Sequence, residues 1–194
     1  MSKRIAILYG HPDPSSKRLC HALSKAYQDG AQLTGHEVER INVSELEFES
    51  IVSSKDFSST TIPEDIQNSQ EIIRWADHLL LIFPLWMGSM PGQYKMFLEQ
   101  VFRPGFALDY SEKGFPGKML KGKSADIVVT MGMPKIAYEG YYFSHGIRNL
   151  KRNILHFCGI KPIRVTYIGG VDHLSPKDMK KWRRKMGHLG SHQN

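Results

Sequence analysis

The chain alternates short apolar runs with longer segments whose apolar residues recur every three or four positions. Apolar runs at residues 4–9, 78–83, 125–130 and 163–168 are bounded by Gly, Pro or polar residues, which is typical of buried strands. Residues 36–43 alternate polar with apolar side chains, which favours a strand nearer the edge of a sheet. The pattern therefore predicts five strands.

Helical periodicity separates these runs, and predicts helices from residue 15 or 16 to about 30, and at about 63–75, 91–102, 144–157 and 176–188. Ser15 or Ser16 is expected to cap the first helix, which Gly30 and Gly35 should end. The Ser- and Thr-rich residues 48–62 predict an irregular surface segment. Residues 103–123 contain six glycines and prolines and predict a long excursion from the sheet, that is, a long loop of the kind that usually serves a function in a compact domain.

Strands and helices thus follow one another in turn over residues 1–194, which we interpret as a single domain. Such alternation favours a doubly wound parallel α/β sheet, because parallel crossovers place helices on both faces and leave the strands apolar. With 194 residues, 41% hydrophobic and 23% charged, the chain has an ordinary globular composition.

The same composition excludes several classes of protein. The longest apolar run, residues 79–87, is far shorter than the roughly 20 residues that cross a bilayer, so we expect no integral membrane span. The first residues lack the features of a secretory signal, and we expect a cytoplasmic protein. Cys20 and Cys158 stand alone, so neither a disulfide framework nor a metal site is predicted.

The formal charge of +7 is concentrated near the end of the chain. Residues 176–194 hold one acid, Asp178, and six bases: Lys177, Lys180, Lys181, Arg183, Arg184 and Lys185. A solvated helix end is the first interpretation; a surface for an acidic partner or a cofactor phosphate is the second. No nucleic-acid-binding motif accompanies the cluster, so no nucleic acid partner is expected.

In a doubly wound sheet, ligands bind beyond the carboxyl ends of the strands. The first such loop, residues 10–18, combines hydroxyls, a helix N-terminus and two cations, which favours a bound phosphate; an N-cap with nothing bound is the alternative. Arg18 in particular should need an anion beside the positive helix end. Neither a dinucleotide-binding glycine fingerprint nor a Walker loop is present.

The second and third loops have a different character. Pro84, Leu85, Trp86 and Met87 are apolar where a loop would ordinarily be polar, and suit a planar aromatic ligand, with core or dimer packing as the alternative. Residues 131–134, which include Gly132, allow close backbone approach from the other side. A phosphate at one loop and a flat ring between two others indicate a flavin nucleotide at a flavodoxin-like switch point.

The sequence resembles the flavodoxin-like NAD(P)H:quinone oxidoreductases, the group of DT-diaphorase, the modulator of drug activity and the potassium-efflux ancillary proteins. The fragments that carry the resemblance are Gly-His-Pro-x-Pro-x-Ser at 10–16, Phe-x-x-Ile-Val-Ser-x-x-Asp at 48–56, Phe-Pro-Leu-Trp at 83–86, Leu-Glu-Gln-Val-Phe at 98–102, Phe-Ala at 106–107 and Ile-Leu-His-Phe-Cys-Gly at 154–159. The resemblance implies a five-stranded sheet of order 2-1-3-4-5.

The resemblance also implies roles for individual residues. The phosphate of a non-covalent FMN or FAD would be held by His11, Ser16 and Arg18, and its ring by Pro84, Leu85, Trp86, Met87, Thr130, Met131 and Gly132. Tyr138 and His145 would line the acceptor pocket and assist proton movement, with Tyr141 or Tyr142 as alternatives to Tyr138. The family's Thr-Thr-Gly-Gly is replaced here by Thr-Met-Gly-Met at 130–133.

The implied activity is ping-pong hydride transfer from NAD(P)H through flavin to a quinone or other aromatic acceptor. A flavin-binding regulatory subunit of a transporter is the alternative, and the basic charge argues against an electron-transfer flavodoxin. Members of the family are homodimers, so Phe102, Phe106 and Tyr110 are expected to face a partner subunit.

Overall fold

The computed structural model describes residues 2–110 and 116–193. Its centre is a parallel sheet of five strands in the order β2-β1-β3-β6-β7. The strands are β1 (Arg4–Tyr9), β2 (Glu37–Asn42), β3 (His78–Pro84), β6 (Ser124–Thr130) and β7 (Ile163–Ile168). Counted within this sheet, the order is the expected 2-1-3-4-5.

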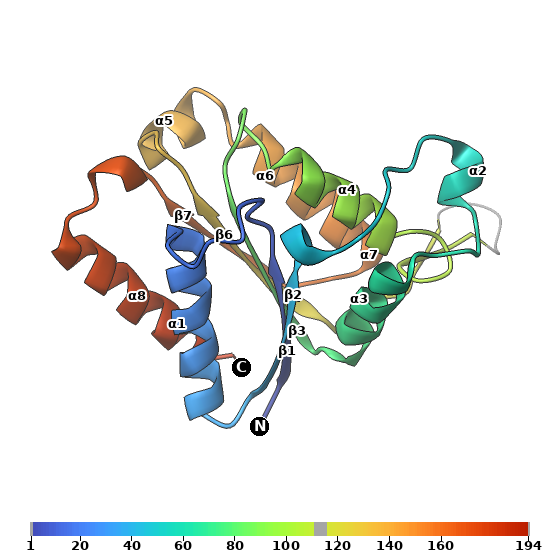
Figure 1. Cartoon of the computed structure of the whole chain (residues 1–194), viewed down its shortest axis with the longest axis horizontal. Helices are drawn as coiled ribbons and strands as arrows, with labels where there is room; N and C mark the ends of the chain where they lie inside the picture. Colours follow the sequence, from blue (N-terminus) through green and yellow to red (C-terminus); the bar gives the residue numbers. More distant parts are fainter. Residues whose placement is uncertain (1, 111–115, 194) are drawn as a thin grey trace.

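Helices cover both faces of the sheet, as expected (Figure 1). On one face lie α1 (Leu19–Leu33) and α8 (Pro176–Ser191); on the other lie α3 (Glu64–Trp75), α4 (Gly92–Val101) and the helical segment 145–158. That segment runs through α6 (His145–Asn149), a π-helical stretch η2 (Leu150–Leu155) and α7 (His156–Cys158). The five predicted helices are therefore present.

Several short elements were not predicted. A one-turn helix, α2 (Ser54–Phe57), interrupts the segment expected to be irregular, and α5 (Lys135–Gly140) follows β6. Short 3-10 turns occur at η1 (Val43–Glu45) and η3 (Val171–His173). The excursion 103–123 carries a small antiparallel pair, β4 (Leu108–Asp109) and β5 (Gly117–Lys118), while its residues 111–115 lie outside the described residues. Each element is too short for a period of 3.6 or 2 to show in the sequence.

Both expectations about the ends of α1 need correction. Its N-cap is Arg18, in extended backbone and without a side-chain cap, so neither Ser15 nor Ser16 caps the helix. Gly30 does not end the helix, which continues to Leu33; Gly35, with φ +83°, follows its C-cap. A left-handed glycine just past a helix is the usual stop signal, whereas a glycine inside one requires another reason.

That reason is the contact between α1 and α8. A methyl group placed on Gly30 would overlap the carbonyl oxygen of Gly187, and one on Gly190 would overlap the carbonyl oxygen of Tyr27. A methyl group on Gly187 itself would lie 3.4 Å from the carbonyl oxygen of Ala26, an ordinary contact. Close approach of the two backbones therefore depends on Gly30 and Gly190.

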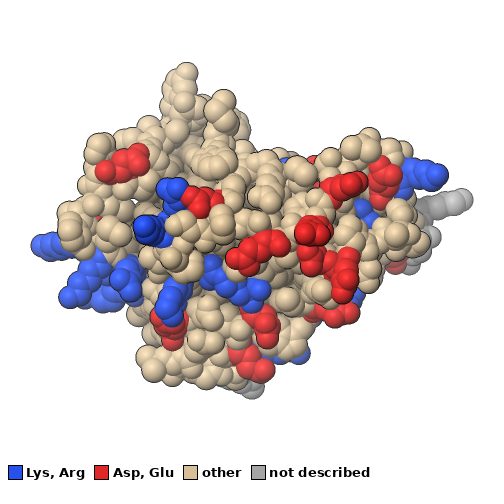
Figure 2. Space-filling view, in the orientation of Figure 1, with Lys and Arg blue, Asp and Glu red and all other residues tan. Residues whose placement is uncertain are grey.

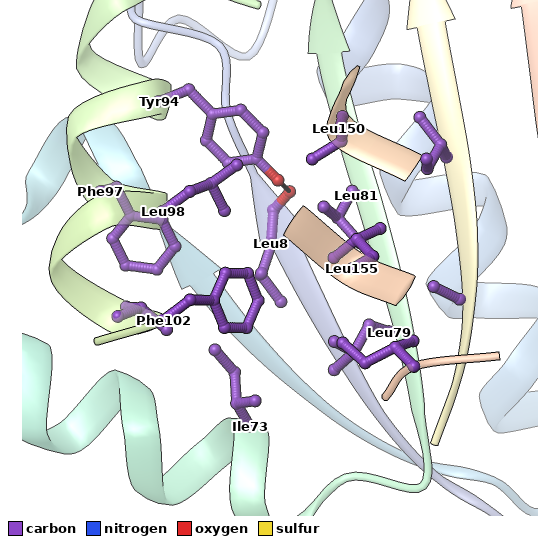
Figure 3. Close-up of a cluster of buried hydrophobic side chains, with 14 of the residues drawn as sticks. Leu8, Ile73, Leu79, Leu81, Tyr94, Phe97, Leu98, Phe102, Leu150 and Leu155 are labelled. Atoms are coloured by element: carbon purple, nitrogen blue, oxygen red, sulfur yellow. Dashed lines mark hydrogen bonds between the residues drawn. The ribbon is translucent and has the colours of Figure 1, made fainter. Parts of the chain in front are cut away.

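On the other face of the sheet, a larger apolar core packs Leu8, Leu79 and Leu81 against the aromatic residues of α4 (Figure 3). The buried Tyr94 hydroxyl donates to the carbonyl oxygen of Leu8 over 3.2 Å. Phe102 belongs to this core, and both it and Phe106 are only 5% exposed. The expectation that these two phenylalanines face a partner subunit is therefore wrong, because the chain's own core buries them; Tyr110 remains 55% exposed.

A buried polar cluster joins the sheet to the end of the chain. The Asp126 carboxylate, 3% exposed, accepts Arg164 Nε at 2.7 Å and Nη2 at 3.0 Å, and Gln193 Nε2 at 2.8 Å. Burial alone would raise the pKa of Asp126, but hydrogen bonding and charge from His78 and Arg164 outweigh it and lower this pKa to about 2. The carboxylate is thus ionised in the fold and fixes both β7 and the segment that follows α8.

Candidate functional site

Three turns meet at the carboxyl ends of β1, β3 and β6. The rings of His11 and Trp86 lie edge to face with centroids 6.5 Å apart, which brings the first turn to the second. The Leu85 N–H donates to the Thr130 carbonyl oxygen over 2.7 Å, which joins the second to the third. The sheet order reverses between β1 and β3, so this is the switch point where open α/β sheets bind ligands.

The first turn begins at Gly10, whose N–H donates to the Ile82 carbonyl oxygen over 2.9 Å. A Cβ at Gly10 would lie 2.5 Å from the ring of Tyr94, so only glycine allows the backbone to pass here. His11 follows, and its Nδ1 accepts the Asp13 N–H at 3.0 Å. Burial and the charge of Arg18 lower the pKa of His11, so near pH 7 the imidazole is neutral and carries its proton on Nε2.

Arg18 does not need an external anion, contrary to the argument from the sequence. Its Nε donates to Asp13 Oδ2 over 2.7 Å and its Nη2 donates to the same oxygen. The Ser15 N–H at 2.8 Å from Oδ1, and then the Arg18 guanidinium, lower the pKa of Asp13. A carboxylate of the same loop thus neutralises the cation, and the donors for an anion are the His11 Nε2–H, the exposed Ser16 hydroxyl and the N-terminus of α1.

The second turn presents an apolar surface to solvent. Trp86 and Ser89 exchange backbone hydrogen bonds of 2.8 and 2.9 Å around Met87 (φ +49°) and Gly88 (φ +78°), a tight two-residue turn. Positive φ is unfavourable for methionine, so the turn is held by its surroundings. Trp86 is 49% exposed and Met87 fully exposed, whereas Pro84 is buried and Leu85 partly buried. The two side chains at the tip are therefore available to a planar ligand.

The third turn points its side chains inward. Thr130 and Met131 are buried, and the Thr130 hydroxyl lies 3.2 Å from the Cys20 thiol on α1. Gly132 is exposed, and a Cβ there would lie 2.8 Å from an Asp172 carboxylate oxygen. Met131 packs in the core, its N–H donates to the Ile168 carbonyl oxygen over 2.9 Å, and its own carbonyl oxygen accepts the Val171 N–H at 3.2 Å. The exposed backbone at Gly132 is therefore the part of this turn that a ligand can approach.

Asp172 was not singled out from the sequence. It lies in η3, directly beyond the end of β7, and borders Gly132. Its position after Gly169 and Gly170 is the available signal, because a glycine pair after a strand marks a turn at the same edge of the sheet. A carboxylate at this position places negative charge beside the third turn.

Tyr138 and His145 both lie against the second turn, in different ways. Tyr138 is fully buried, and its hydroxyl donates to the Gly88 carbonyl oxygen over 3.0 Å; burial raises its pKa. His145 is exposed at the start of α6, and a methyl group on the next residue, Gly146, would overlap that same carbonyl oxygen. Thus α6 is pressed against the second turn, with His145 at its rim.

The two alternative tyrosines are accessible. Tyr142 is 44% exposed, with its ring centroid 6.3 Å from that of Tyr138 and 5.0 Å from that of Tyr141, which is more exposed still.

No group of three or more His, Cys, Asp or Glu side chains is placed to hold a metal ion in the described ranges 2–110 and 116–193.

These observations define a parallel α/β protein with a site at the switch point of its sheet. The chain belongs to the family described as having a flavodoxin-like fold, whose model matches residues 3–189.

Individual relatives agree with this assignment. An uncharacterized NAD(P)H oxidoreductase of Haemophilus influenzae is 26% identical over 178 residues, which cover 90% of this chain and 87% of the relative. FMN-dependent NADH:quinone oxidoreductase 2 of Listeria innocua is 33% identical over 103 residues, about half of each chain (53% and 48%). The structure of NAD(P)H:quinone oxidoreductase from Methanothermobacter marburgensis matches with a TM-score of 0.85 and 23% identity over the whole of both chains, which shows the shared fold.

Proposed function

We propose that the protein is a flavin-dependent NAD(P)H oxidoreductase that binds FMN and reduces a quinone or another aromatic acceptor. The observation that carries the proposal is the contact between the three turns, in which the exposed Trp86 lies against His11 of the turn that precedes α1. The relatives described above, named as NAD(P)H and FMN-dependent oxidoreductases, support the same activity.

The donors present fit an FMN. A phosphate suits the neutral His11 with its proton on Nε2, the Ser16 hydroxyl and the backbone N–H groups at the N-terminus of α1. A flat ring suits the apolar tip of the second turn and the open backbone at Gly132. Arg18, already paired with Asp13, would act on a phosphate through its remaining N–H groups.

When bound, the flavin supplies hydride acceptance from the nicotinamide and hydride donation to the acceptor. The chain supplies position and proton control. Tyr138 fixes the second turn through its bond to the Gly88 carbonyl oxygen, so we assign it a positioning role. The accessible His145 borders the same turn, and the accessible Tyr142 lies against Tyr138; we assign to these two side chains the donation of protons to the reduced acceptor.

Steady-state kinetics test this proposal. Initial rates measured while both NADH or NADPH and a benzoquinone are varied should give parallel double-reciprocal lines, as a ping-pong cycle requires. Intersecting lines would contradict the ping-pong cycle, and absence of turnover with FMN present would contradict the activity. The alternative of a transporter subunit has no support among these relatives, whose names describe oxidoreductases.

Two further features belong to the proposal. A homodimer is supported by the exposed apolar residues that surround the site, namely Trp86, Met87, Tyr141, Tyr142 and Phe143, and light scattering on the purified protein tests it. We also propose a cytoplasmic location.

As a separate finding, within residues 2–110 and 116–193 no helix has both the length and the apolar character that crossing a bilayer demands.

A further inference from the structure

The surface of α8 carries six exposed cations that the site does not use. They are Lys177, Lys180, Lys181, Arg183, Arg184 and Lys185. They recur at one-, two- and three-residue steps around the outer side of the helix, opposite Trp182, Met186 and Leu189, which pack toward α1. The cations thus form one broad convex face, which we call the α8 face.

The first turns of α8 project from the body of the protein. Every residue from 175 to 181 is exposed, and the first partly buried side chain is Trp182. A capping box between Ser175 and Asp178 nevertheless closes the helix end: the Asp178 N–H donates to Ser175 Oγ at 3.2 Å, and the Ser175 N–H donates to Asp178 Oδ2 at 3.3 Å. The α8 face is therefore an ordered helical surface.

Opposite charge lies on the other side of the molecule. Residues 37–71, from β2 to α3, contain nine acidic and two basic residues. Figure 2 shows the separation, with Lys and Arg gathered at the left of the molecule, where α8 lies, and Asp and Glu at the right. A molecule charged in this way is oriented by an anionic surface, because its basic side is attracted while its acidic side is repelled.

We propose that the α8 face binds the surface of an anionic phospholipid bilayer. Clusters of four to eight Lys and Arg on an amphipathic helix are typical of such binding, and six are present here. A convex face exposed on a projecting helix can approach a plane. The exposed Met179 in the projecting turns adds one apolar side chain for contact at headgroup depth.

A nucleic acid is the competing polyanion. Residues 175–189 contain no Asn or Gln, the side chains that read adenine, so the Lys and Arg of the α8 face offer contacts to phosphate and, among the bases, to guanine. The bilayer proposal stands independently of the proposed reaction, although an acceptor dissolved in lipid would be brought near the enzyme by it.

Vesicle sedimentation tests the inference. The full-length protein should sediment with phosphatidylcholine vesicles that contain about one-third phosphatidylglycerol, at about 0.1 M salt, and remain in solution with pure phosphatidylcholine. In the triple variant Lys177→Gln, Lys180→Gln, Arg184→Gln, the partition coefficient should fall about 100-fold, because each cation near the surface contributes about fivefold. Glutamine keeps the helix propensity close to that of Lys and Arg.

The matched control removes the same charge elsewhere. Lys55→Gln, Lys121→Gln, Arg152→Gln changes three exposed cations outside α8 and should leave partitioning within about twofold. Circular dichroism verifies that both variants are folded. Equal losses in the two variants, or equal binding of wild type to neutral and anionic vesicles, would overturn the proposal. So would release of the protein from anionic vesicles by short duplex DNA at equal phosphate concentration, which would identify a nucleic acid as the preferred partner.

Discussion

The free ring nitrogen of His11, Nε2, is a hydrogen-bond donor and not an acceptor. The Asp13 N–H occupies its Nδ1, and burial with the nearby Arg18 lowers its pKa, so Nε2 carries the proton at neutral pH. Substitution His11→Ala should weaken FMN binding 10- to 100-fold, the loss expected for about 1.5–3 kcal/mol from a hydrogen bond to a charged group. Fluorescence quenching of FMN measures the Kd. The control His156→Ala, on α7, should leave the Kd unchanged; equal affinity in the His11 variant would remove it from the phosphate site.

His145 is the accessible group at the rim of the second turn, whereas the hydroxyl of Tyr138 is engaged beneath it. His145→Gln should lower kcat at least about tenfold with FMN affinity retained, because general acid catalysis contributes about 100-fold or more. Tyr142→Phe measures the share of the neighbouring tyrosine in the same assay. Unchanged turnover in the His145 variant would exclude it from proton transfer.

At this scale the sequence located the three turns but not the state of their side chains. His11, Trp86 and Gly132 were named from it, and their exposure or neutral state in the structure fits the proposed roles. The pairing of Arg18 with Asp13 and the inward turn of Met131 were not predicted. The partner of a loop side chain depends on the path that the loop backbone takes in space. The order of residues along the chain does not encode that path.

Among the elements, the pair α1 and α8 depends on two glycines. Gly30→Ala or Gly190→Ala should each lower the free energy of unfolding by about 1–3 kcal/mol, because the added methyl meets a carbonyl oxygen of the facing helix. Urea denaturation measures the change.

Gly187→Ala on the same helix is the matched control. Its methyl would make an ordinary contact at 3.4 Å, so this variant should be as stable as wild type or about 0.5–1 kcal/mol more stable. Equal destabilisation by all three substitutions would show that general crowding between the helices, and not these two close approaches, sets the effect.

The long periodic elements were predictable, and the reason is physical. Strands buried on both faces are continuously apolar, and helices on a sheet repeat every 3.6 residues, so β3 and α1 were evident in the sequence. The prediction that Gly30 ends α1 was wrong because a glycine that ends a helix and one that permits close helix packing look alike in sequence. The six-residue α5 was not predicted because it buries only Tyr138 and therefore shows no periodic pattern of apolar residues.

For the whole molecule, the Asp126 cluster predicts a response to acid. The pKa of Asp126 in the fold, about 2, lies below its ordinary value of 3.8, so the folded state binds fewer protons than the unfolded chain. Its stabilisation is complete above about pH 4 and is lost as the pH falls toward 2. The loss amounts to about 2 kcal/mol.

Asp126→Asn should therefore be less stable at neutral pH and should lose about 2 kcal/mol less than wild type between pH 4 and pH 2. Chemical denaturation at each pH measures both quantities. The exposed carboxyl of α1 provides the control, since Asp29→Asn makes the same change in charge and should follow the wild-type pH profile. Parallel profiles for the wild type and the Asp126 variant would show that the cluster does not govern acid stability.

The central claim is that three turns at one edge of the sheet hold FMN and pass its electrons to an aromatic acceptor. Purified protein mixed with FMN and freed of excess should retain one FMN per chain. Its yellow colour, which is that of oxidised flavin, should bleach when NADH or NADPH is added without oxygen and return on addition of a quinone. Protein that retains no FMN, or holds an FMN that neither nicotinamide reduces, would contradict the account.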